Sequence, residues 1–374
     1  MDSALESQHP WPTGFQTRKS QSLVLFLCVI ISLHEFLSLR RQLPVVDVRS
    51  ENEFVQGHIR GALNIPILNN AERVAVGTDY KQKGQMEAIK TGFRLVGPRI
   101  IDIVNEAEKI APDRELIVHC WRGGMRSSNF CQFLEMARLR TRQLKGGYKT
   151  YRQEALESYK RPFQFIVIGG MTGSGKSDIL RVLQAKGEQV LDLEKLASHK
   201  GSIFGGLLMP PQPTTEQFQN DLFEEILKFD LSRRIWVEDE SIAVGKIFLP
   251  EPLWRRMSVS PIVELEVPKD VRVSRLVSEY GAADKMKFLE CMEAITKKLG
   301  GQHFASAKEL LFQDRMPETI SILLNYYDKA YANGLAKKKE RIKHRVQWSG
   351  HAIEQLADDL IVAWNGEQVL LNPS

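Results

Sequence analysis

Short apolar runs alternate with amphipathic stretches along most of this chain. Runs rich in Val and Ile, too short for buried helices, predict strands at residues 44–48, 115–119, 163–168, 234–237 and 262–267. Apolar residues spaced three or four positions apart predict helices at 98–111, 178–185 and 214–229. Such alternation indicates an α/β protein with parallel sheets, whose functional loops lie at the carboxyl ends of the strands. Beyond about residue 270 the pattern is mostly helical.

Chain length and composition indicate the number of domains and the cellular compartment. A chain of 374 residues favours two domains, and 43% hydrophobic with 26% charged residues is typical of a soluble globular protein. The net charge of +5 permits an anionic partner without requiring one. Four cysteines (Cys28, Cys120, Cys131 and Cys291) are too scattered for a disulfide framework, so we expect a cytoplasmic protein.

The apolar stretch from Leu23 to Leu33 resembles the core of a signal peptide, because Arg18 and Lys19 precede it. It is too short for a membrane span, which needs about 20 residues, and no small-residue cleavage site follows it. We therefore expect no membrane association and an opening helix over its second half. The predicted division is an extension at residues 1–30, a first domain at 31–157 and a second domain at 158–370.

The run from Ile117 to Ser128 carries the strongest chemical signal. A strand ends at Cys120, a glycine pair turns the chain, and a helix opens near Arg126. Backbone N–H groups of such a loop form an anion cradle that favours a thiolate, and an arginine adds a fixed positive charge. The predicted site is a nucleophilic Cys120 with Arg126, in a loop made by Trp121, Arg122, Gly123, Gly124, Met125 and Ser127.

The spacing Cys120-x5-Arg126 is also the signature of cysteine-dependent phosphatases. Those enzymes need an acid that protonates the leaving oxygen, and the sequence offers no unambiguous one. From this loop alone, a phosphatase-like enzyme and a simple sulfurtransferase both stay open, each fused to a regulatory phosphate-binding domain.

A second phosphate loop follows the strand at 163–168. Gly170-x4-Gly175-Lys176-Ser177 is a complete Walker A pattern between a strand and a helix. Its backbone N–H groups would wrap phosphates, Lys176 would reach the terminal ones, and Ser177 could ligate Mg²⁺. The predicted phosphate-binding residues are Gly170, Thr172, Gly173, Ser174, Gly175, Lys176 and Ser177. Glu238 or Asp239, after the strand at 234–237, is the candidate Walker B acid, with a solvated acidic turn as the alternative.

The stretch from Val46 to Pro66 resembles the opening of the rhodanese homology domain, through Asp47-Val48-Arg49 and Gly57-His58-Ile59. Leu144 to Tyr148 resembles that domain's closing turn. Simple rhodaneses have an active loop one residue shorter than the loop after Cys120. The longer loop suits a tetrahedral oxyanion, so we expect a chalcogen carrier that meets a phosphate-bearing donor.

A rhodanese-like domain followed by a P-loop domain with a helical tail resembles the tRNA 2-selenouridine synthase family over residues 32–365. Ala75–Gln85, Cys120–Ser127, the Walker A loop and Trp236–Ser241 carry the resemblance. It implies a transferase that replaces sulfur by selenium in wobble 2-thiouridine of tRNA, with selenophosphate as donor. It also implies an associated geranyl transfer from geranyl diphosphate to that sulfur.

The resemblance assigns roles to the two loops. Cys120 would carry selenium as S-selanylcysteine while phosphate occupies the loop at 121–126, and Arg126 would neutralise the anion. The Walker A loop would hold geranyl diphosphate or a nucleotide, and a selenophosphate-producing enzyme would supply the donor. We expect a monomer. A non-enzymatic RNA-binding protein or sensor is disfavoured because Cys120 and Arg126 are both intact.

A tRNA substrate needs basic and aromatic surface. The candidates are Lys337, Lys338, Lys339, Arg341, Lys343, His344 and Arg345, with Tyr326, Tyr327 and Tyr331 just upstream. A solvated helical face with core tyrosines is the alternative for each of them. Cys131 is expected in the core, and Cys28 and Cys291 have no evident partner.

Overall fold

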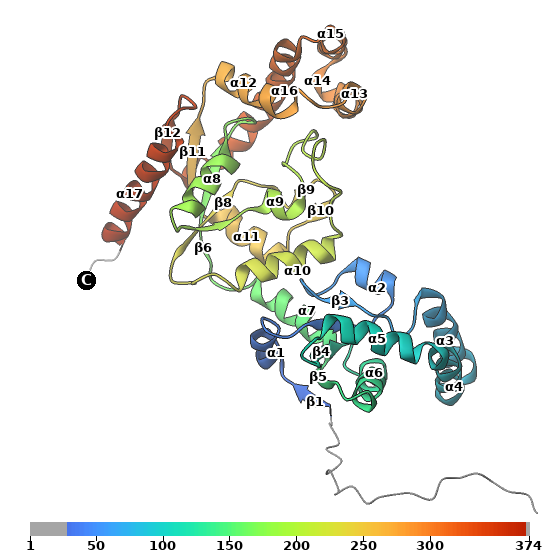
Figure 1. Ribbon diagram of the computed structural model, residues 1–374. Helices are drawn as coiled ribbons and strands as arrows, with labels where there is room; N and C mark the ends of the chain where they lie inside the picture. Colours follow the sequence, from blue (N-terminus) through green and yellow to red (C-terminus); the bar gives the residue numbers. More distant parts are fainter. Residues whose placement is uncertain (1–27, 372–374) are drawn as a thin grey trace, which may run out of the picture.

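The computed structural model describes residues 28–371 as two lobes, each built on a parallel five-stranded sheet (Figure 1). The N-terminal lobe has the strand order β1-β5-β4-β2-β3, and the C-terminal lobe has the order β12-β11-β6-β8-β7. All pairs within both sheets are parallel. The α/β class with parallel sheets and a mostly helical C-terminal region is therefore confirmed.

The strands of the N-terminal lobe are β1 (Val29–Ile31), β2 (Val45–Asp47), β3 (Leu63–Asn64), β4 (Glu115–His119) and β5 (Arg140–Leu144). Its helices are α1 (Leu33–Leu39), α2 (Glu51–Gln56), α3 (Asn70–Lys83), α4 (Gln85–Val96), η1 (Gly97–Arg99), α5 (Ile100–Ile110), α6 (Met125–Met136) and α7 (Gly147–Ser158). Helices α2 and α3 begin at capping boxes, in which Ser50 pairs with Glu53 and Asn69 with Glu72.

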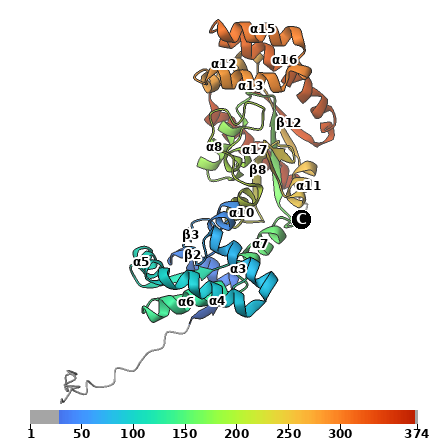
Figure 2. The same ribbon diagram turned by 90° about the vertical axis from the view of Figure 1, so that its right-hand side faces the viewer.

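The strands of the C-terminal lobe are β6 (Gln164–Gly170), β7 (Gln189–Leu191), β8 (Arg234–Glu238), β9 (Ala243–Val244), β10 (Ile247–Phe248), β11 (Ile262–Glu266) and β12 (Ile342–Gln347). Its helices are α8 (Lys176–Ala185), α9 (Leu193–Ala197), α10 (Thr215–Ile226), α11 (Glu251–Val259), α12 (Lys269–Tyr280), α13 (Lys285–Ala294), α14 (Thr296–Leu299), α15 (Gly301–Phe312), α16 (Met316–Ala336), η2 (Lys339–Arg341) and α17 (Ile353–Leu371). Helices α12 to α16 gather at the end remote from the N-terminal lobe (Figure 2).

One expectation about the elements was wrong. The second half of the apolar stretch at 23–33 begins as strand β1, not as a helix, because its β-branched residues pair with β5 at the sheet edge. Helix α1 starts only after Ser32, whose side chain closes a capping box with Glu35. The helical region beyond residue 270 is interrupted by β12, which alternates half-buried and exposed residues beside β11. The predicted extension at 1–30 falls mainly on residues 1–27, outside the described residues.

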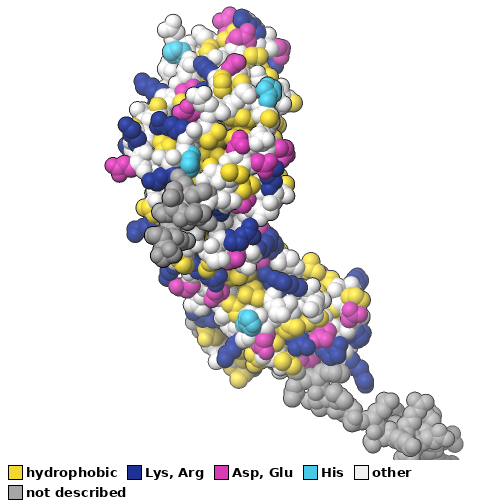
Figure 3. Space-filling model, turned by 90° about the vertical axis from the view of Figure 1, so that its left-hand side faces the viewer, with side chains coloured by type: hydrophobic (Ala, Val, Ile, Leu, Met, Phe, Trp, Pro, Cys, Tyr) yellow, Lys and Arg dark blue, Asp and Glu magenta, His cyan; other side chains and the backbone are white. Residues whose placement is uncertain are grey.

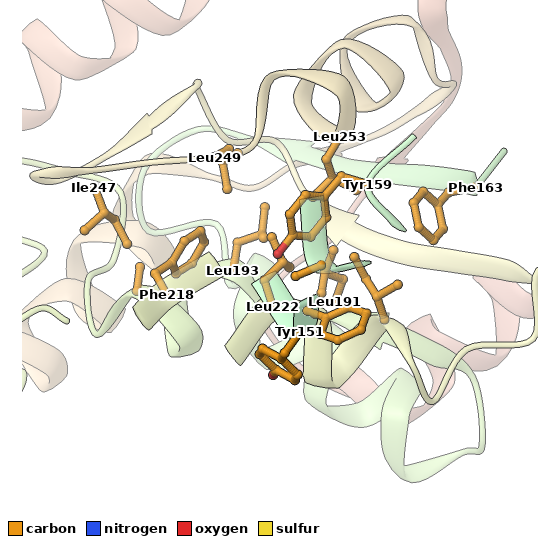
Figure 4. Close-up of a cluster of buried hydrophobic side chains, with 14 of the residues drawn as sticks. Tyr151, Tyr159, Phe163, Leu191, Leu193, Phe218, Leu222, Ile247, Leu249 and Leu253 are labelled. Atoms are coloured by element: carbon orange, nitrogen blue, oxygen red, sulfur yellow. The ribbon is translucent and has the colours of Figure 1, made fainter. Parts of the chain in front are cut away.

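The two lobes share one hydrophobic core. Buried residues of α1 and α7 join buried residues of β6, α10 and α11 in a single cluster that includes Phe36, Tyr151, Phe223 and Leu253. Figure 4 shows Tyr151 of α7 and Tyr159, which directly follows α7, among the side chains of Leu191, Leu222 and Leu253. Helix α10 therefore packs against both lobes and fixes one relative to the other.

Polar bonds surround this core at the lobe boundary. Glu224 of α10 accepts two hydrogen bonds from the Arg40 guanidinium, at 2.6 and 2.5 Å, and one from the Tyr151 hydroxyl at 2.5 Å. Arg60 pairs with Asp221 at 3.0 Å and with Glu225 at 2.6 Å. Arg40 and Arg60 are thus both paired with carboxylates of α10 across the boundary.

Candidate active sites

The Cys120 loop lies at the carboxyl edge of the first sheet. Strand β4, which ends at His119, has β5 on one side and β2 on the other. Counted from the boundary between β2 and β4, strands β2 and β3 lie on one side, and strands β4, β5 and β1 lie on the other. Ligands of open parallel sheets bind where the order reverses in this way. The loop between β4 and α6 therefore occupies the position where this fold places a reactive group.

The Cys120 thiol is buried beside the first turn of α6. Its Sγ lies 3.2 Å from the Ser127 Oγ and 4.0 Å from the Gly124 carbonyl oxygen. The Ser127 hydroxyl, whose oxygen also accepts from the Gln143 Nε2 at 2.8 Å, has one proton, which it can donate either to Gly124 or to the sulfur. A thiolate at Cys120 would therefore have a hydrogen-bond donor already in contact.

The first turn of α7 holds the backbone of the Cys120 loop by hydrogen bonds. The backbone N–H groups of Tyr148 and Lys149 donate to the carbonyls of Cys120 and Trp121, each at 2.9 Å. Gly147 has φ +60°, and a Cβ there would lie 2.3 Å from the Cys120 carbonyl oxygen. The Gln143 amide donates to the Gly123 carbonyl at 2.7 Å. A Cβ at Gly147 would also lie 2.6 Å from the Gly123 nitrogen and 3.0 Å from the Arg122 nitrogen, so only a glycine at this position lets α7 approach the loop backbone this closely.

Arg126 contacts a carboxylate. Its guanidinium makes a bidentate ion pair with Glu53 of α2, at 2.6 and 3.2 Å. Burial raises the pKa of Glu53, but the bonds to Arg126 outweigh burial and lower it. Arg122, by contrast, is exposed. Arg126 must leave Glu53 before it can neutralise a bound anion.

A buried charged cluster beneath the loop was not assigned from the sequence. Asp47 and Arg49, both essentially unexposed, form an ion pair at 2.6 Å, and the Arg49 guanidinium lies 3.9 Å from the Tyr148 ring centroid. Burial would raise the pKa of Asp47, but His119 and Arg49 lower it. Burial lowers the pKa of His119 itself. Asp47-Val48-Arg49 is recognisable in the sequence as a signature of the fold. Sequence spacing does not reveal that the Tyr148 ring packs on the Arg49 guanidinium.

Cys131 is buried in the core as predicted, and Cys28 lies beside it. A hydrogen bond with Cys131 lowers the pKa of Cys28 to about 7. The same interaction, with burial, raises the pKa of Cys131. This contact could not be predicted from the sequence, because more than a hundred positions separate the two cysteines.

An apolar cavity of about 170 Å³ opens beside the Cys120 loop. Helices α3 and α4 form its wall, with Ala88, Ile89 and Phe93, and Met125 and Phe133 of α6 close it. A cavity of about 150 Å³ with a similar lining is large enough for benzene. The space can therefore hold a small apolar group beside Met125 and Arg126, at the end of the Cys120 loop.

The Walker A loop lies where β6 meets α8, at the centre of the second sheet. Strand β6 has β8 on one side and β11 on the other, so the order reverses here as well. The loop lines a cavity of about 820 Å³. Gly175 has φ +80° directly before α8, and the Lys176 Nζ donates to the Gly170 carbonyl at 3.1 Å. The glycine-rich turn and the N-terminus of α8 are thus adjacent, as a phosphate cradle requires, and phosphate binding by this loop stays a prediction.

Acidic side chains crowd the floor of this cavity. The Ser177 hydroxyl donates to Glu194 at 2.6 Å, and Glu238 accepts from the Glu194 backbone N–H at 2.8 Å. Burial raises the pKa of Glu194 and of Glu238, and burial with the neighbouring Glu194 raises the pKa of Glu240 to about 8. Asp239 is paired with Lys338, whose Nζ lies 2.7 Å from both carboxylate oxygens.

These residues are compatible with a divalent cation held together with a phosphate. Within residues 28–371 no cluster of three or more His, Cys, Asp or Glu side chains could hold a metal alone. One oxygen of Glu238 is nevertheless buried without a hydrogen-bond partner in the described structure, and Ser177 and Glu194 lie beside the cradle. Mg²⁺ keeps waters and phosphate oxygens among its ligands, so this incomplete set suffices.

The predicted tRNA-contacting residues separate into groups. Tyr326 and Tyr327 pack in the hydrophobic cluster of the helical end, and Arg345 on β12 pairs with Glu264 at 3.0 Å. Tyr331, Lys338 and Arg341 line a cavity of about 390 Å³ beside the Walker A cavity. On the face shown in Figure 3, Lys and Arg side chains are interspersed with Asp and Glu over both lobes. The predicted tRNA-contacting residues are thus divided between a hydrophobic cluster, an ion pair on the sheet edge and the wall of a cavity.

No helix within residues 28–371 is long and apolar enough to cross a membrane. The profile of the tRNA 2-selenouridine synthase AAA domain matches residues 163–359, and that of the rhodanese-like domain matches residues 32–154. The chain is 35% identical over 338 residues to a tRNA 2-selenouridine synthase of Sulfurovum sp. (strain NBC37-1), covering 81% of this chain and 91% of that protein.

A tRNA 2-selenouridine synthase of Nitrosomonas europaea is 31% identical over 368 residues, covering 83% of this chain and 93% of that protein. Among solved structures, the N-terminal domain of a putative ATP/GTP binding protein from Clostridium difficile 630 is 38% identical. It covers 34% of this chain and 98% of that chain, with a TM-score of 0.33.

Proposed function

Because the chain belongs to the tRNA 2-selenouridine synthase family, we propose that it replaces sulfur by selenium in wobble 2-thiouridine of tRNA. Selenophosphate is the proposed donor, and S-geranyl-2-thiouridine, made from geranyl diphosphate, is the proposed intermediate. The observation that carries this proposal is the buried Cys120 thiol, in contact with the Ser127 hydroxyl at the start of α6, in the same chain as a Walker A loop that lines a large cavity.

A reaction order in which geranylation precedes selenation gives each of the two loops a chemical role. A thiocarbonyl sulfur is a poor leaving group, whereas an S-alkylated sulfur leaves as a thiolate. The Walker A loop is suited to the diphosphate of geranyl diphosphate, because its cradle binds adjacent phosphates. The apolar cavity beside Cys120 is suited to the geranyl chain, since each buried CH₂ contributes about 0.8 kcal/mol to binding.

Electron balance constrains the role of Cys120. If the thiolate took selenium directly from selenophosphate, the phosphorus would be left at the phosphite level, and restoring phosphate would need an oxidant. In a balanced course, the selenium of selenophosphate forms a bond to C2 of the S-geranyl nucleoside and geranylthiolate leaves. The Cys120 thiolate then attacks phosphorus, the P–Se bond breaks, and 2-selenouridine is released before water removes the phosphoryl group from Cys120.

A mass measurement on Cys120 distinguishes these two courses. The chain is incubated with selenophosphate and S-geranylated RNA, quenched with acid, and digested. A Cys120 peptide with the selenium isotope pattern supports the S-selanylcysteine carrier, and a phosphorylated peptide supports attack at phosphorus. Cys120→Ala should abolish selenouridine formation but preserve geranylation. Unchanged selenouridine formation by this variant would exclude both roles.

The Walker A loop and the apolar cavity have separate tests. Lys176→Ala should weaken calorimetric binding of geranyl diphosphate, with ATP measured alongside to identify the preferred ligand. Ala88→Phe should fill the cavity and slow selenation of S-geranylated RNA, with diphosphate binding unchanged. Val55→Phe, at an exposed position of α2 outside the cavity lining, is the matched control. Equal rates for the Ala88 variant and its control would remove the cavity from the mechanism.

A further inference from the structure

The cavity of about 390 Å³ beside the Walker A loop has the composition of a nucleobase site. Trp254 and Met257 of α11, Tyr331 of α16, and Lys338 and Arg341 after α16 line it. Its volume falls in the range of small-ligand pockets, which begins at about 300 Å³. Apolar and aromatic faces thus meet two cationic side chains in one concave space.

This cavity shares a wall with the phosphate cradle. Asp239, Glu240, Ser241, Ala330 and Tyr331 line both cavities. The ion pair between Lys338 and Asp239, at 2.7 Å, lies on this common wall. A group bound in the smaller cavity is therefore adjacent to a phosphorylated molecule bound on the Walker A loop.

Its polar groups are held in place before any ligand arrives. The Arg341 guanidinium donates to the backbone carbonyls of Ser260 and Met257, both at 2.8 Å. The Tyr331 hydroxyl is buried, makes no hydrogen bond within residues 28–371, and stays protonated because burial raises its pKa. Fixed donors beside an aromatic ring are what a protein uses to read the edge of an unstacked base.

We propose that this cavity receives a single unstacked pyrimidine nucleotide of RNA, with its base against Trp254 and Tyr331. The proposal rests on the proposed function, under which that nucleotide is the wobble 2-thiouridine. In this position the C2 sulfur can approach the carbon that a diphosphate ester on the Walker A loop presents. A purely apolar occupant fits the site poorly, because it would displace water from the Lys338–Asp239 ion pair and from the Arg341 guanidinium without offering them a polar contact.

Photocrosslinking provides the first test. An anticodon stem-loop with 4-thiouridine at the wobble position is bound to the full chain and irradiated, and the crosslinked peptides are sequenced by mass spectrometry. The expected result is a crosslink to the α11 peptide containing Trp254 or to the α16 peptide containing Tyr331. Crosslinks confined to other segments would overturn the proposal.

Affinity measurements provide the second test. Trp254→Leu should weaken binding of the stem-loop about tenfold, as expected for one lost stacking contact. It should have no effect on the same stem-loop with an abasic wobble position. Phe248→Leu, at an exposed aromatic residue outside the cavity, is the control, and calorimetric diphosphate binding verifies that both variants are folded.

The outcomes distinguish a failure of the proposed function from a failure of the base site alone. If the wild-type chain binds no stem-loop, the proposed function and this inference both fail. If it binds, but Trp254→Leu weakens the uridine and abasic stem-loops equally, only the base site fails.

Discussion

The ion pair between Arg126 and Glu53 predicts that this glutamate limits anion binding in the Cys120 loop. Both side chains are about one quarter exposed, and Arg126 contacts both carboxylate oxygens, at 2.6 and 3.2 Å. Exposed ion pairs contribute about 0.2–1 kcal/mol, and bidentate geometry places this pair near the upper end. An anion that recruits Arg126 must first overcome that energy, which corresponds to about fivefold in affinity.

Glu53→Gln should therefore tighten phosphate binding about fivefold, because the neutral amide holds Arg126 less strongly. The amide oxygen can still accept from the Ser50 backbone N–H, so the start of α2 is preserved. The assay follows alkylation of Cys120 by iodoacetamide at increasing inorganic phosphate, and the protection curve gives the apparent dissociation constant.

Lowering the pH should likewise tighten phosphate binding by the wild-type chain. The pKa of Glu53 is lowered in the folded protein, so the pair is intact at neutral pH and is lost as pH falls through that pKa. Glu72→Gln is the matched control, since Glu72 also closes a capping box and pairs with an arginine, Arg99, at 3.0 Å. Unchanged or weaker phosphate binding in Glu53→Gln would show that Arg126 does not reach the anion.

Three further predictions concern the loop support, the Walker A floor and the lobe boundary. Gln143→Met should lower the free energy of unfolding by about 2 kcal/mol, because the buried Gly123 carbonyl loses its donor; an unchanged urea midpoint would contradict this. Since the pKa of Glu240 is raised to about 8, its neutral form favours the folded state, and that contribution decreases as pH rises toward 8. Calorimetric diphosphate affinity should decrease over the same range, and Glu240→Gln should remove the dependence. Glu224→Ala should destabilise the lobe boundary by about 3 kcal/mol by leaving Arg40 unpaired, measured as faster hydrogen exchange in α1 and α10; unchanged exchange would exclude that role.

Much of the fold followed from local patterns. The strands that precede Cys120 and Gly170 are continuous apolar runs, and each is followed by glycines and a helix, so their positions could be predicted from the chain alone. Strand β12 could not, because Lys343 and Arg345 alternate with half-buried residues on a sheet edge and give the segment a basic, polar composition. Strand β1 was mistaken for helix because a three-residue edge strand has no periodicity of its own.

The roles within the sites were less predictable, because they depend on pairing between distant segments. Arg126 and Glu53 are 73 positions apart, and Lys338 and Asp239 are 99 apart. Sequence spacing identifies side chains with the right chemistry but does not reveal which charge is already neutralised. The predicted roles of Cys120, Arg126 and the Walker A residues accordingly stay predictions for the experiments above.

The core shared by the two lobes limits how a substrate can pass from one loop to the other. Helix α10 and the tyrosines of α7 pack in one continuous cluster, so the lobes are not joined by a loose tether along which a reactive loop could swing. Under the proposed function, the wobble nucleoside of the RNA would therefore have to leave one loop and bind at the other. Each transfer would then compete with release of the RNA, and the lifetime of the RNA complex would determine how much alkylated intermediate is lost to solution.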